Sequence, residues 1–239
     1  MRFINKSATP LSLKVWIRTN PDDCTYKNLP TEVKDSIRRS LLLEQGYLDA
    51  YTMQRIELDT CHIEHFAPQS HFDEKSVDYA NMLACWPKER SPGTFESGDE
   101  FGAVRKEDST ETICSPLVAA EVTNAFAYKS NGEIAGRTPL AVKTIDVLNL
   151  NARRLCSLRK SAILSALGLP ASRKLSQQQL RNKNSSSLTI AAAQKRLKQV
   201  GLPDANGKLT PFCAAVEFWL KKFIGLRTNL SHQRKKKPG

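Results

Sequence analysis

The sequence predicts an α+β protein that is mainly helical, with short strands near its middle and a basic helical region at its C-terminal end. Apolar residues recur at helical spacing in residues 31–45 and again throughout residues 138–224. Between these stretches, aromatic and β-branched residues form short runs that are typical of strands. The 239 residues suffice for one large domain, or for a compact domain with an appendage.

The first helix is expected from Thr31 to Gln45 and should end at Gly46. Val33, Ile37 and Leu41 repeat there at helical spacing, whereas the polar stretch ahead of them reads as irregular. The later helices are expected at residues 140–149, 151–167, 175–183, 189–200 and 211–224, with Gly168, Gly201 and Gly225 as stops.

Two strands of one hairpin are expected at residues 47–56 and 61–66, with the four residues between them as the turn. Pro68 should end the second strand, because proline cannot donate to a strand ladder. Residues 78–85 read as the opening of a short helix or as a tight loop. A long loop rich in proline, glycine, serine and charge is expected at residues 87–112.

A weaker strand signal lies at residues 125–134. It turns at Asn131-Gly132, the pair that most favours a type I′ hairpin turn. A second, smaller hairpin is therefore expected ahead of the C-terminal helices.

The positive charge is concentrated in the C-terminal region. Residues 1–150 hold 17 Lys and Arg against 22 Asp and Glu, a net charge of −5, whereas residues 151–239 hold 19 against 2, a net charge of +17. Such an excess is typical of a region that binds a polyanion, and nucleic acid is the leading candidate. The alternative is a solvated basic surface that only aids solubility. Two regions are therefore predicted, 1–150 and 151–239.

The sequence lacks the features of a membrane or secreted protein. No run of about 18 apolar residues is present, and the N-terminus has no apolar signal-peptide core. The six cysteines form no Cys-x-x-Cys pair and are expected to be free thiols. The prediction is a cytoplasmic protein that does not contact a membrane.

Three of the four histidines, His62, His65 and His71, lie within ten residues and beside Glu64. Hydrolysis of a phosphodiester needs an activated water, a base with a pKa near neutrality and a cation that neutralises the phosphoryl oxygens. Histidine supplies such a base, so His62 and His65 are candidate catalytic residues. Carboxylate and amide oxygens suit Mg²⁺ or Mn²⁺, and Asn81 can return an amide toward Glu64.

The alternation of side chains along a strand places His62 and Glu64 on one face and His65 on the other. Glu64 and His65 can therefore serve one phosphate only if the chain bends at the strand end, which Ala67-Pro68 makes plausible. The alternative is that these histidines are satisfied or surface side chains without a catalytic role.

Several segments match a known family in order and spacing over residues 1 to about 160. They are Leu42-Leu43-Glu44-Gln45-Gly46-Tyr47-Leu48, Ala50-Tyr51 with Arg55-Ile56, His62-Ile63-Glu64-His65-Phe66-x-Pro68, Asp78-Tyr79-x-Asn81-Met82-Leu83-x-Cys85, Phe101-Gly102-Ala103 with Lys106, and Thr144-Ile145-x-x-Leu148-Asn149-Leu150-Asn151. In these segments the sequence resembles the HNH endonucleases of retron-associated and Septu-type bacterial antiphage systems.

The resemblance implies a ββα-metal (HNH) core that hydrolyses nucleic acid with a divalent ion, Mg²⁺ or Mn²⁺. His65 would act as general base on water, with Glu64 and Asn81 near the metal. Asn81 would either ligate the metal or orient the base. A nuclease of this type should lose activity in the variant His65→Ala and on chelation of divalent ions.

The third motif of the family should fall between Arg105 and Asp108, where its usual histidine is missing. Lys106 as a phosphate contact, or Asp108 as a metal ligand, would take its place. Relatives commonly carry Cys-x-x-Cys where this chain has residues 49–52, and those cysteines bind structural zinc with later ones. Because Cys85 lacks such partners here, no structural zinc is expected.

Family members act beside a larger SMC/ABC-like ATPase, and retron versions also associate with a reverse transcriptase and its RNA-linked single-stranded DNA. The resemblance implies a toxic effector subunit of such an assembly. An apolar face of the last helix would dock on the ATPase or belong to the core: Phe212, Val216, Trp219, Leu220 and Phe223. Nucleic-acid contacts are expected from Arg105, Lys106, Arg153, Arg154, Arg159 and Lys160, unless these form a solvated helix face.

Two other functions compete with the nuclease. One is a non-catalytic nucleic-acid-binding or assembly subunit with a degenerate HNH site. The other is a metal-binding regulator that uses His62, His65, His71 and Cys61. Charge alone does not distinguish a DNA substrate from an RNA such as transfer RNA.

Overall fold

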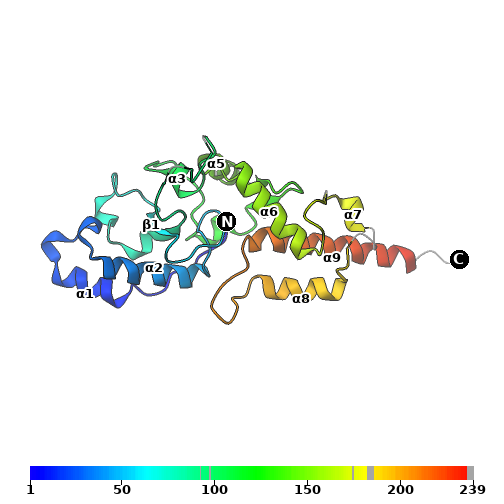
Figure 1. Ribbon diagram of the computed structural model, residues 1–239, viewed down its shortest axis with the longest axis horizontal. Coiled ribbons are helices and arrows are strands. Elements are labelled where there is room, and N and C mark those ends of the chain that lie inside the picture. The colour runs from blue at the N-terminus through cyan, green and yellow to red at the C-terminus, as the bar shows by residue number, and fades with distance from the viewer. Residues whose placement is uncertain (92, 97, 174, 182–185, 236–239) are drawn as a thin grey trace.

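The chain folds as a mainly helical α+β protein with two small antiparallel sheets, as the sequence predicts. The computed structural model describes residues 1–91, 93–96, 98–173, 175–181 and 186–235. Residues 174, 182–185 and 236–239 of the predicted C-terminal region lie outside this described part, and so does the end of the helix predicted at residues 175–183. Its helices and strands are α1 (Leu11–Thr19), α2 (Thr31–Gln45), β1 (His62–His65), β2 (Met82–Cys85), α3 (Ala103–Lys106), α4 (Ala119–Val122), β3 (Phe126–Tyr128), β4 (Ile134–Gly136), α5 (Pro139–Val147), α6 (Arg153–Ala166), α7 (Gln177–Arg181), α8 (Ile190–Val200) and α9 (Cys213–Lys235). Figure 1 shows α1 and α2 at one end of the molecule and α7, α8 and α9 at the other.

Helix α2 has the predicted bounds and ends at Gly46, which adopts a φ of +59°. A Cβ at this glycine would lie 2.4 Å from the side chain of Leu209, so no other residue fits this helix end. Helix α1 was not expected, because the prediction for the first 30 residues was an irregular chain. The helix buries Leu13 and packs Trp16 and Ile17 against the same cluster as α2. These three apolar residues are the i, i+3, i+4 signal of a short amphipathic helix.

The predicted partner of strand β1 was wrong. Strand β1 pairs antiparallel with β2, with His62 opposite Cys85 and His65 opposite Met82, and not with residues 47–56. Residues 47–56 instead form a tight turn with a single bridge between Leu48 and Arg55. A short run of strand-forming residues does not say which segment it pairs with, and the partner lies beyond a 16-residue connection.

The second hairpin, β3–β4, and helices α5 to α8 are confirmed within a few residues of their predicted bounds. The predicted end of the last helix was wrong, since α9 continues through Gly225 to Lys235. A Cβ at Gly225 would meet nothing within 4 Å, so the glycine is an exposed helical residue and not a cap. Two residues later, Arg227 donates its Nε–H to the carbonyl of Leu180 at 2.8 Å, which ties α9 to α7.

Two apolar clusters form the core of the described chain. The smaller cluster lies between α1, α2 and the β1–β2 sheet, and the larger one runs from the N-terminal residues to α9. The five apolar residues that the sequence offered either for docking or for the core are all buried in the larger cluster, four of them on α9 and one just ahead of it: Phe212, Val216, Trp219, Leu220 and Phe223. Of the two alternatives, that face is therefore core.

The segment that leads into α9 binds the turn at residues 47–56. The amide of Leu209 donates to the carbonyl of Gly46 at 3.0 Å, and that of Phe212 donates to Met53 at 2.9 Å. The two predicted regions thus share backbone hydrogen bonds as well as one core. Within the described residues, no helix is both long enough and apolar enough to cross a lipid bilayer.

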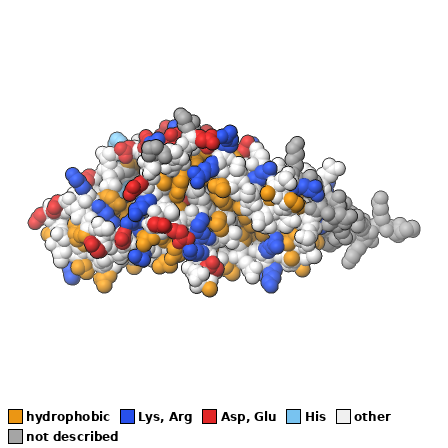
Figure 2. All heavy atoms as spheres, in the orientation of Figure 1, with side chains coloured by type: hydrophobic (Ala, Val, Ile, Leu, Met, Phe, Trp, Pro, Cys, Tyr) orange, Lys and Arg blue, Asp and Glu red, His pale blue; other side chains and the backbone are white. Residues whose placement is uncertain are grey.

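The charges follow the pattern of the sequence. Figure 2 shows acidic side chains over the part of the molecule that holds α1 to α3, while Lys and Arg side chains dominate over α8. The long arm of α6 to α9 carries only Asp204 and Glu217 as acidic residues in its sequence. A basic surface of this kind attracts polyanions without selecting among them.

Candidate active site

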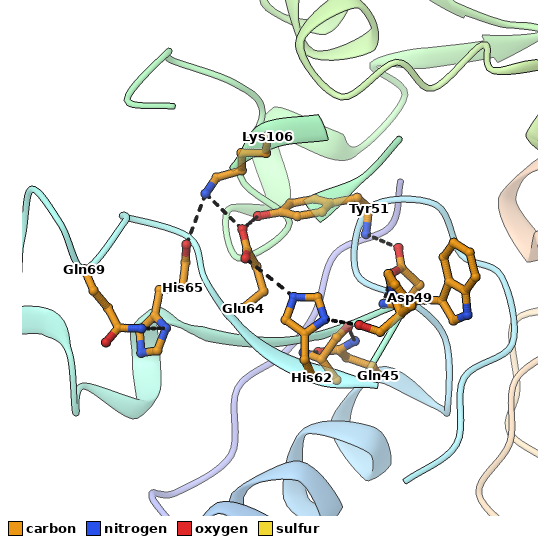
Figure 3. Close-up of polar contacts among 11 residues, drawn as sticks. Gln45, Asp49, Tyr51, His62, Glu64, His65, Gln69 and Lys106 are labelled. Carbon is orange, nitrogen blue, oxygen red and sulfur yellow. Dashed lines mark hydrogen bonds and ion pairs between the residues drawn. The ribbon is translucent and has the colours of Figure 1, made fainter. Parts of the chain in front are cut away.

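Strand β1 presents two faces with different environments. His62 and Glu64 lie on one face and are partly exposed, whereas Ile63 and His65 lie on the other and are buried. The strand does not bend before its end, because Phe66 still donates its amide to the carbonyl of Asn81 at 2.9 Å. Figure 3 shows the side chains of Glu64 and His65 pointing away from each other. The expected convergence of these two side chains is therefore not present.

His65 is held by both ring nitrogens and is 5% exposed. Its Nε2 lies 2.8 Å from the carbonyl of Ser76, which can only accept, so Nε2 carries the proton. The amide of Gln69 then donates to Nδ1 at 2.9 Å, and the ring of Tyr26 packs edge-on with its centroid 4.8 Å away. Burial lowers the pKa of His65 below its ordinary 6.5, so the ring is neutral at neutral pH and Nδ1 is its basic atom.

Asn81 is 7% exposed and uses both ends of its amide on one residue. Its Oδ1 accepts from the amide of Ala67 at 2.8 Å, and its Nδ2 donates to the carbonyl of Ala67 at 2.9 Å. A further contact reaches the carbonyl of Lys75 at 3.4 Å. Asn81 therefore fixes the loop that follows the base. Both ends of its amide are thus engaged with backbone groups, and metal ligation by Asn81 stays a prediction.

Glu64 meets an ammonium group. The Nζ of Lys106 donates to Oε1 of Glu64 at 2.9 Å and to the backbone carbonyl of His65 at 3.1 Å. The hydroxyl of Tyr51 donates to the same carboxylate oxygen at 3.3 Å. Burial, assisted by the charge of Glu64, raises the pKa of Tyr51 well above 10, so this hydroxyl stays protonated. Figure 3 shows Lys106 and Tyr51 reaching Glu64 from the same side of the strand.

His62 shares the face of Glu64 and is the more accessible of the two candidate bases, with 30% of its side chain exposed. Its Nδ1 lies 2.6 Å from the carbonyl of Pro87, and its Nε2 lies 3.8 Å from Oε2 of Glu64. Burial opposes protonation of His62, but the hydrogen bond and the charge of Glu64 outweigh it and raise its pKa above 6.5. The two histidines of one strand are thus shifted in opposite directions.

Helix α3 delivers Lys106 to the site. Gly102 precedes the helix with a φ of +64°, and a Cβ there would lie 3.3 Å from Thr52. Lys106 is 3% exposed, so it is not the surface phosphate contact that the sequence suggested. Arg105 and Asp108 flank it and are both exposed.

The residues in this arrangement do not fit a divalent ion. Mg²⁺ and Mn²⁺ need several oxygen ligands, and a carboxylate that already pairs with an ammonium is a poor one. Among the described residues, no three or more His, Cys, Asp or Glu side chains gather as a metal-binding group. Asp108 does not complete such a group with Glu64, and neither do the histidines and Cys61 that the regulator hypothesis requires.

The predicted nucleic-acid contacts separate into accessible and inaccessible residues. Arg153 and Arg154 are exposed at the start of α6 and line a cavity of about 350 Å³. The guanidinium of Arg154 lies 4.8 Å above the ring of Trp86. Lys160 is half-buried, and Arg159 is 2% exposed with its guanidinium bound to backbone carbonyls. The prediction that Arg159 contacts phosphate was therefore wrong.

Three polar residues of this site were missed in the sequence: Gln45, Asp49 and Gln69. Gln45 exchanges hydrogen bonds with the backbone of Ala84, donating at 2.8 Å and accepting at 2.8 Å, and so fixes α2 to β2. Its signal is a polar residue on the apolar side of a helix. Gln69 follows His65 by four residues, which is the only signal that the sequence offers for its contact.

Asp49 is fully buried and closes the turn at residues 47–56. Its carboxylate accepts from the amides of Tyr51 and Thr52 at 3.0 and 2.7 Å, from the hydroxyl of Thr52 at 2.8 Å, and from the amide of Trp86 at 2.8 Å. Burial raises the pKa of Asp49, and these donors oppose the shift. The carboxylate thus links the turn to the end of β2. Its signal in the sequence is an acidic residue within an aromatic run.

A cavity of about 740 Å³ lies between the N-terminal residues and the first half of α9. Of the described residues that line it, none belongs to the predicted site. Its walls combine apolar side chains with cations such as Arg137 and Lys221, and it is remote in sequence from strand β1. The chemistry of the histidines therefore does not depend on this cavity.

Similarity to known proteins assigns no function to the chain. No protein-family model matches it, and no curated protein matches it. The candidate site rests on its own geometry and on the resemblance of its motifs.

Proposed function

We propose that this chain is a nuclease that hydrolyses phosphodiester bonds of nucleic acid, with His65 as the general base. The observation that carries the proposal is the contact of His65 Nε2 with the carbonyl of Ser76 at 2.8 Å. A carbonyl only accepts, so Nε2 carries the proton and Nδ1 carries the lone pair, which can take a proton from water once the amide of Gln69 moves away. The lowered pKa keeps the ring in its basic form at neutral pH.

The amide of Gln69 now occupies Nδ1, and a water molecule takes its place in the reactive state. Gln69 is only half-buried, and catalytic hydrogen bonds in free enzymes commonly differ from those in the complex with substrate. In the reaction, the water oxygen forms a bond to phosphorus while its proton passes to Nδ1 of His65. The bond from phosphorus to the leaving oxygen breaks, and that oxygen takes a proton from solvent.

The order of elements supports a core of the ββα type. Strands β1 and β2 form the sheet, and α3 brings Lys106 to the carbonyl of His65. Asn81 braces Ala67 in the loop between the strands. In this reading the middle motif residue positions the base, and the third motif residue is a lysine.

The basic start of α6 offers a path for nucleic acid toward this sheet. Arg154 stacks on Trp86, and the next residue, Pro87, binds His62 through its carbonyl. Arg153 is exposed and its guanidinium pairs with Glu96 on the surface, an interaction that phosphate can replace at little cost. The raised pKa of His62 favours its cationic form, which suits a contact to a phosphate.

The assembly is proposed on the resemblance alone: a toxic effector subunit beside an SMC/ABC-like ATPase, with a retron reverse transcriptase and its RNA-linked DNA. A cytoplasmic location is proposed as well. All six cysteines are free thiols, which suits a reducing compartment.

The test is cleavage of separate pools of plasmid, single-stranded DNA and total RNA by the wild type, His65→Ala and His71→Ala. His71 is exposed and serves as the matched control. We expect His65→Ala to lower the cleavage rate by roughly 10²-fold to 10⁴-fold, the usual contribution of a general base. Cleavage by His65→Ala at the rate of His71→Ala would refute the role.

A second candidate is a non-catalytic nucleic-acid-binding subunit. The pairing of Glu64 with Lys106 and the burial of His65 favour it, because both groups are already satisfied. It predicts that the wild type binds nucleic acid with a steep dependence on salt and cleaves none of the three pools.

A further inference from the structure

The carboxylate of Glu64 has a resident cation. Lys106 contributes an ammonium at 2.9 Å, and this ammonium is 3% exposed at the side chain. Burial of a charge is costly unless it is paired and hydrogen-bonded. Its two acceptors, the carboxylate of Glu64 and the carbonyl of His65, meet that requirement.

The remaining donors around Glu64 are also directed at this carboxylate. Tyr51 is buried and donates its hydroxyl to Oε1, and His62 faces Oε2. The carboxylate of Asp49 lies next to this cluster, where it accepts from the backbone amide of Tyr51, but among the described residues Glu64 is the acidic side chain that pairs with Lys106. At Glu64 itself, the negative charge is matched by the permanent positive charge of Lys106, with His62, whose pKa is raised, as a second cation.

The ammonium binds the backbone of the base, on the strand face opposite the ring of His65. It donates to the backbone carbonyl of His65 at 3.1 Å. Without Lys106, Glu64 would place an unbalanced negative charge on the strand face that it shares with His62. With Lys106, the same end of the strand carries no net repulsion.

We propose that the ammonium of Lys106 is the permanent cation of this site and that it takes the place of a divalent ion at Glu64. This replaces the Mg²⁺ or Mn²⁺ dependence that the family resemblance implies. The proposal has a catalytic consequence, which rests on the proposed nuclease function: cleavage proceeds with divalent ions chelated. It also has a structural consequence, which does not rest on that function: Glu64 binds a divalent ion only after Lys106 is removed.

The structural consequence is tested by titrating the whole chain with Mn²⁺ and following the free ion by electron paramagnetic resonance. The variants are Lys106→Asn, which frees Glu64 and adds an amide oxygen, and Lys106→Met, which removes the charge and keeps the length. Lys6→Asn is the matched control, because Lys6 forms a second well-buried lysine–glutamate pair among the described residues, with Glu44 at 3.0 Å. Circular dichroism establishes that each variant is folded.

We expect the wild type and the Lys6→Asn variant to bind no Mn²⁺. The Lys106→Asn variant should gain one Mn²⁺ site. The double variant that also carries Glu64→Gln should lose this site again. If the asparagine variant does not fold, the same gain is expected of Lys106→Met. Mn²⁺ binding by the wild type that Glu64→Gln abolishes would overturn the proposal. So would a folded Lys106 variant that gains no site, or an equal gain in Lys6→Asn.

The catalytic consequence is tested by cleavage with excess chelator. The wild type should keep its rate to within about twofold, whereas an enzyme that works through a bound metal loses activity by orders of magnitude. Strong inhibition by the chelator would overturn the proposal. Absence of cleavage with and without Mg²⁺ would instead refute the nuclease function, and the Mn²⁺ titration would still decide the role of Lys106.

Discussion

The sheet region around β1 and the helical arm from α6 to α9 are held together by different forces. Around β1, buried polar side chains make specific hydrogen bonds, as Asp49 does to the turn and Asn81 does to its loop. In the arm, apolar side chains of α9 pack against α6, α7 and α8. Hydrogen bonds are directional, so they hold the side chains of the sheet region in defined positions. The hydrophobic effect is not directional, so burial stabilises the arm without fixing exact side-chain geometry.

The difference matters for function. An apolar helix interface tolerates small shifts, but a base must hold its ring nitrogen within hydrogen-bond reach of a water. In the sheet region, the buried side chains of Asp49, His65 and Asn81 each bind backbone groups and so fix one segment of the site.

The largest expected effect is in the arm, for Phe223→Ala. Phe223 is 0% exposed on α9, and removal of its ring leaves a cavity, so the free energy of unfolding should fall by about 3–5 kcal/mol. The control is Phe3→Ala, because Phe3 is partly exposed, and this change should lower the free energy of unfolding by under about 1 kcal/mol. Urea denaturation measures both. Equal losses would show that the arm is not held by its core.

The next effect is in the sheet region, for Asp49→Ala. The change leaves four buried donors without their acceptor, and we expect a loss of about 3 kcal/mol, since each unsatisfied buried group is costly. Asp204 is the control in the arm, because its exposed carboxylate closes a turn through two backbone amides. Asp204→Ala should destabilise less in the same denaturation experiment, and a larger loss there would contradict the contrast.

A smaller effect is expected for Asn81→Ala, at about 2 kcal/mol, because both backbone groups of Ala67 lose their partner. The chain offers a close control in Asn151. Its amide makes the same pair of bonds to Ile134, at 2.8 and 3.0 Å, but Asn151 itself is exposed, whereas Asn81 is buried. Asn151→Ala should therefore cost less than half as much. Hydrogen exchange at Ala67 and Ile134 would localise each loss.

The contrast also explains what the sequence predicts well. Helices α2, α5, α6 and α8 follow from apolar periodicity, because that period is the cause of their burial. The partner of β1 does not follow, because pairing depends on a turn closed by the side chain of Asp49, which no periodicity records. The apolar face of α9 was correctly found, but periodicity does not distinguish a docking face from core.

The candidate site divides in the same way. The residue types at His62, Glu64, His65, Asn81 and Lys106 were all identified from their motifs. Their contacts were not. The alternation of strand β1 sends Glu64 and His65 to opposite faces. Helix α3 brings Lys106 to Glu64 from a position 42 residues further along the chain. Arg159 is buried by tertiary packing, and helical periodicity alone does not predict whether an arginine of α6 is buried or exposed.

The central claim is that His65 keeps its proton on Nε2 and offers Nδ1 as a base. Imidazole ¹⁵N resonances of His65, followed against pH, measure both the tautomer and the pKa. We expect the Nε2–H tautomer and a pKa below 6.5, with folding stability that is fully present above pH 6.5 and falls as the pH drops toward the folded-state pKa. A proton on Nδ1, or a pKa above 6.5, would contradict the assignment of His65 as the base.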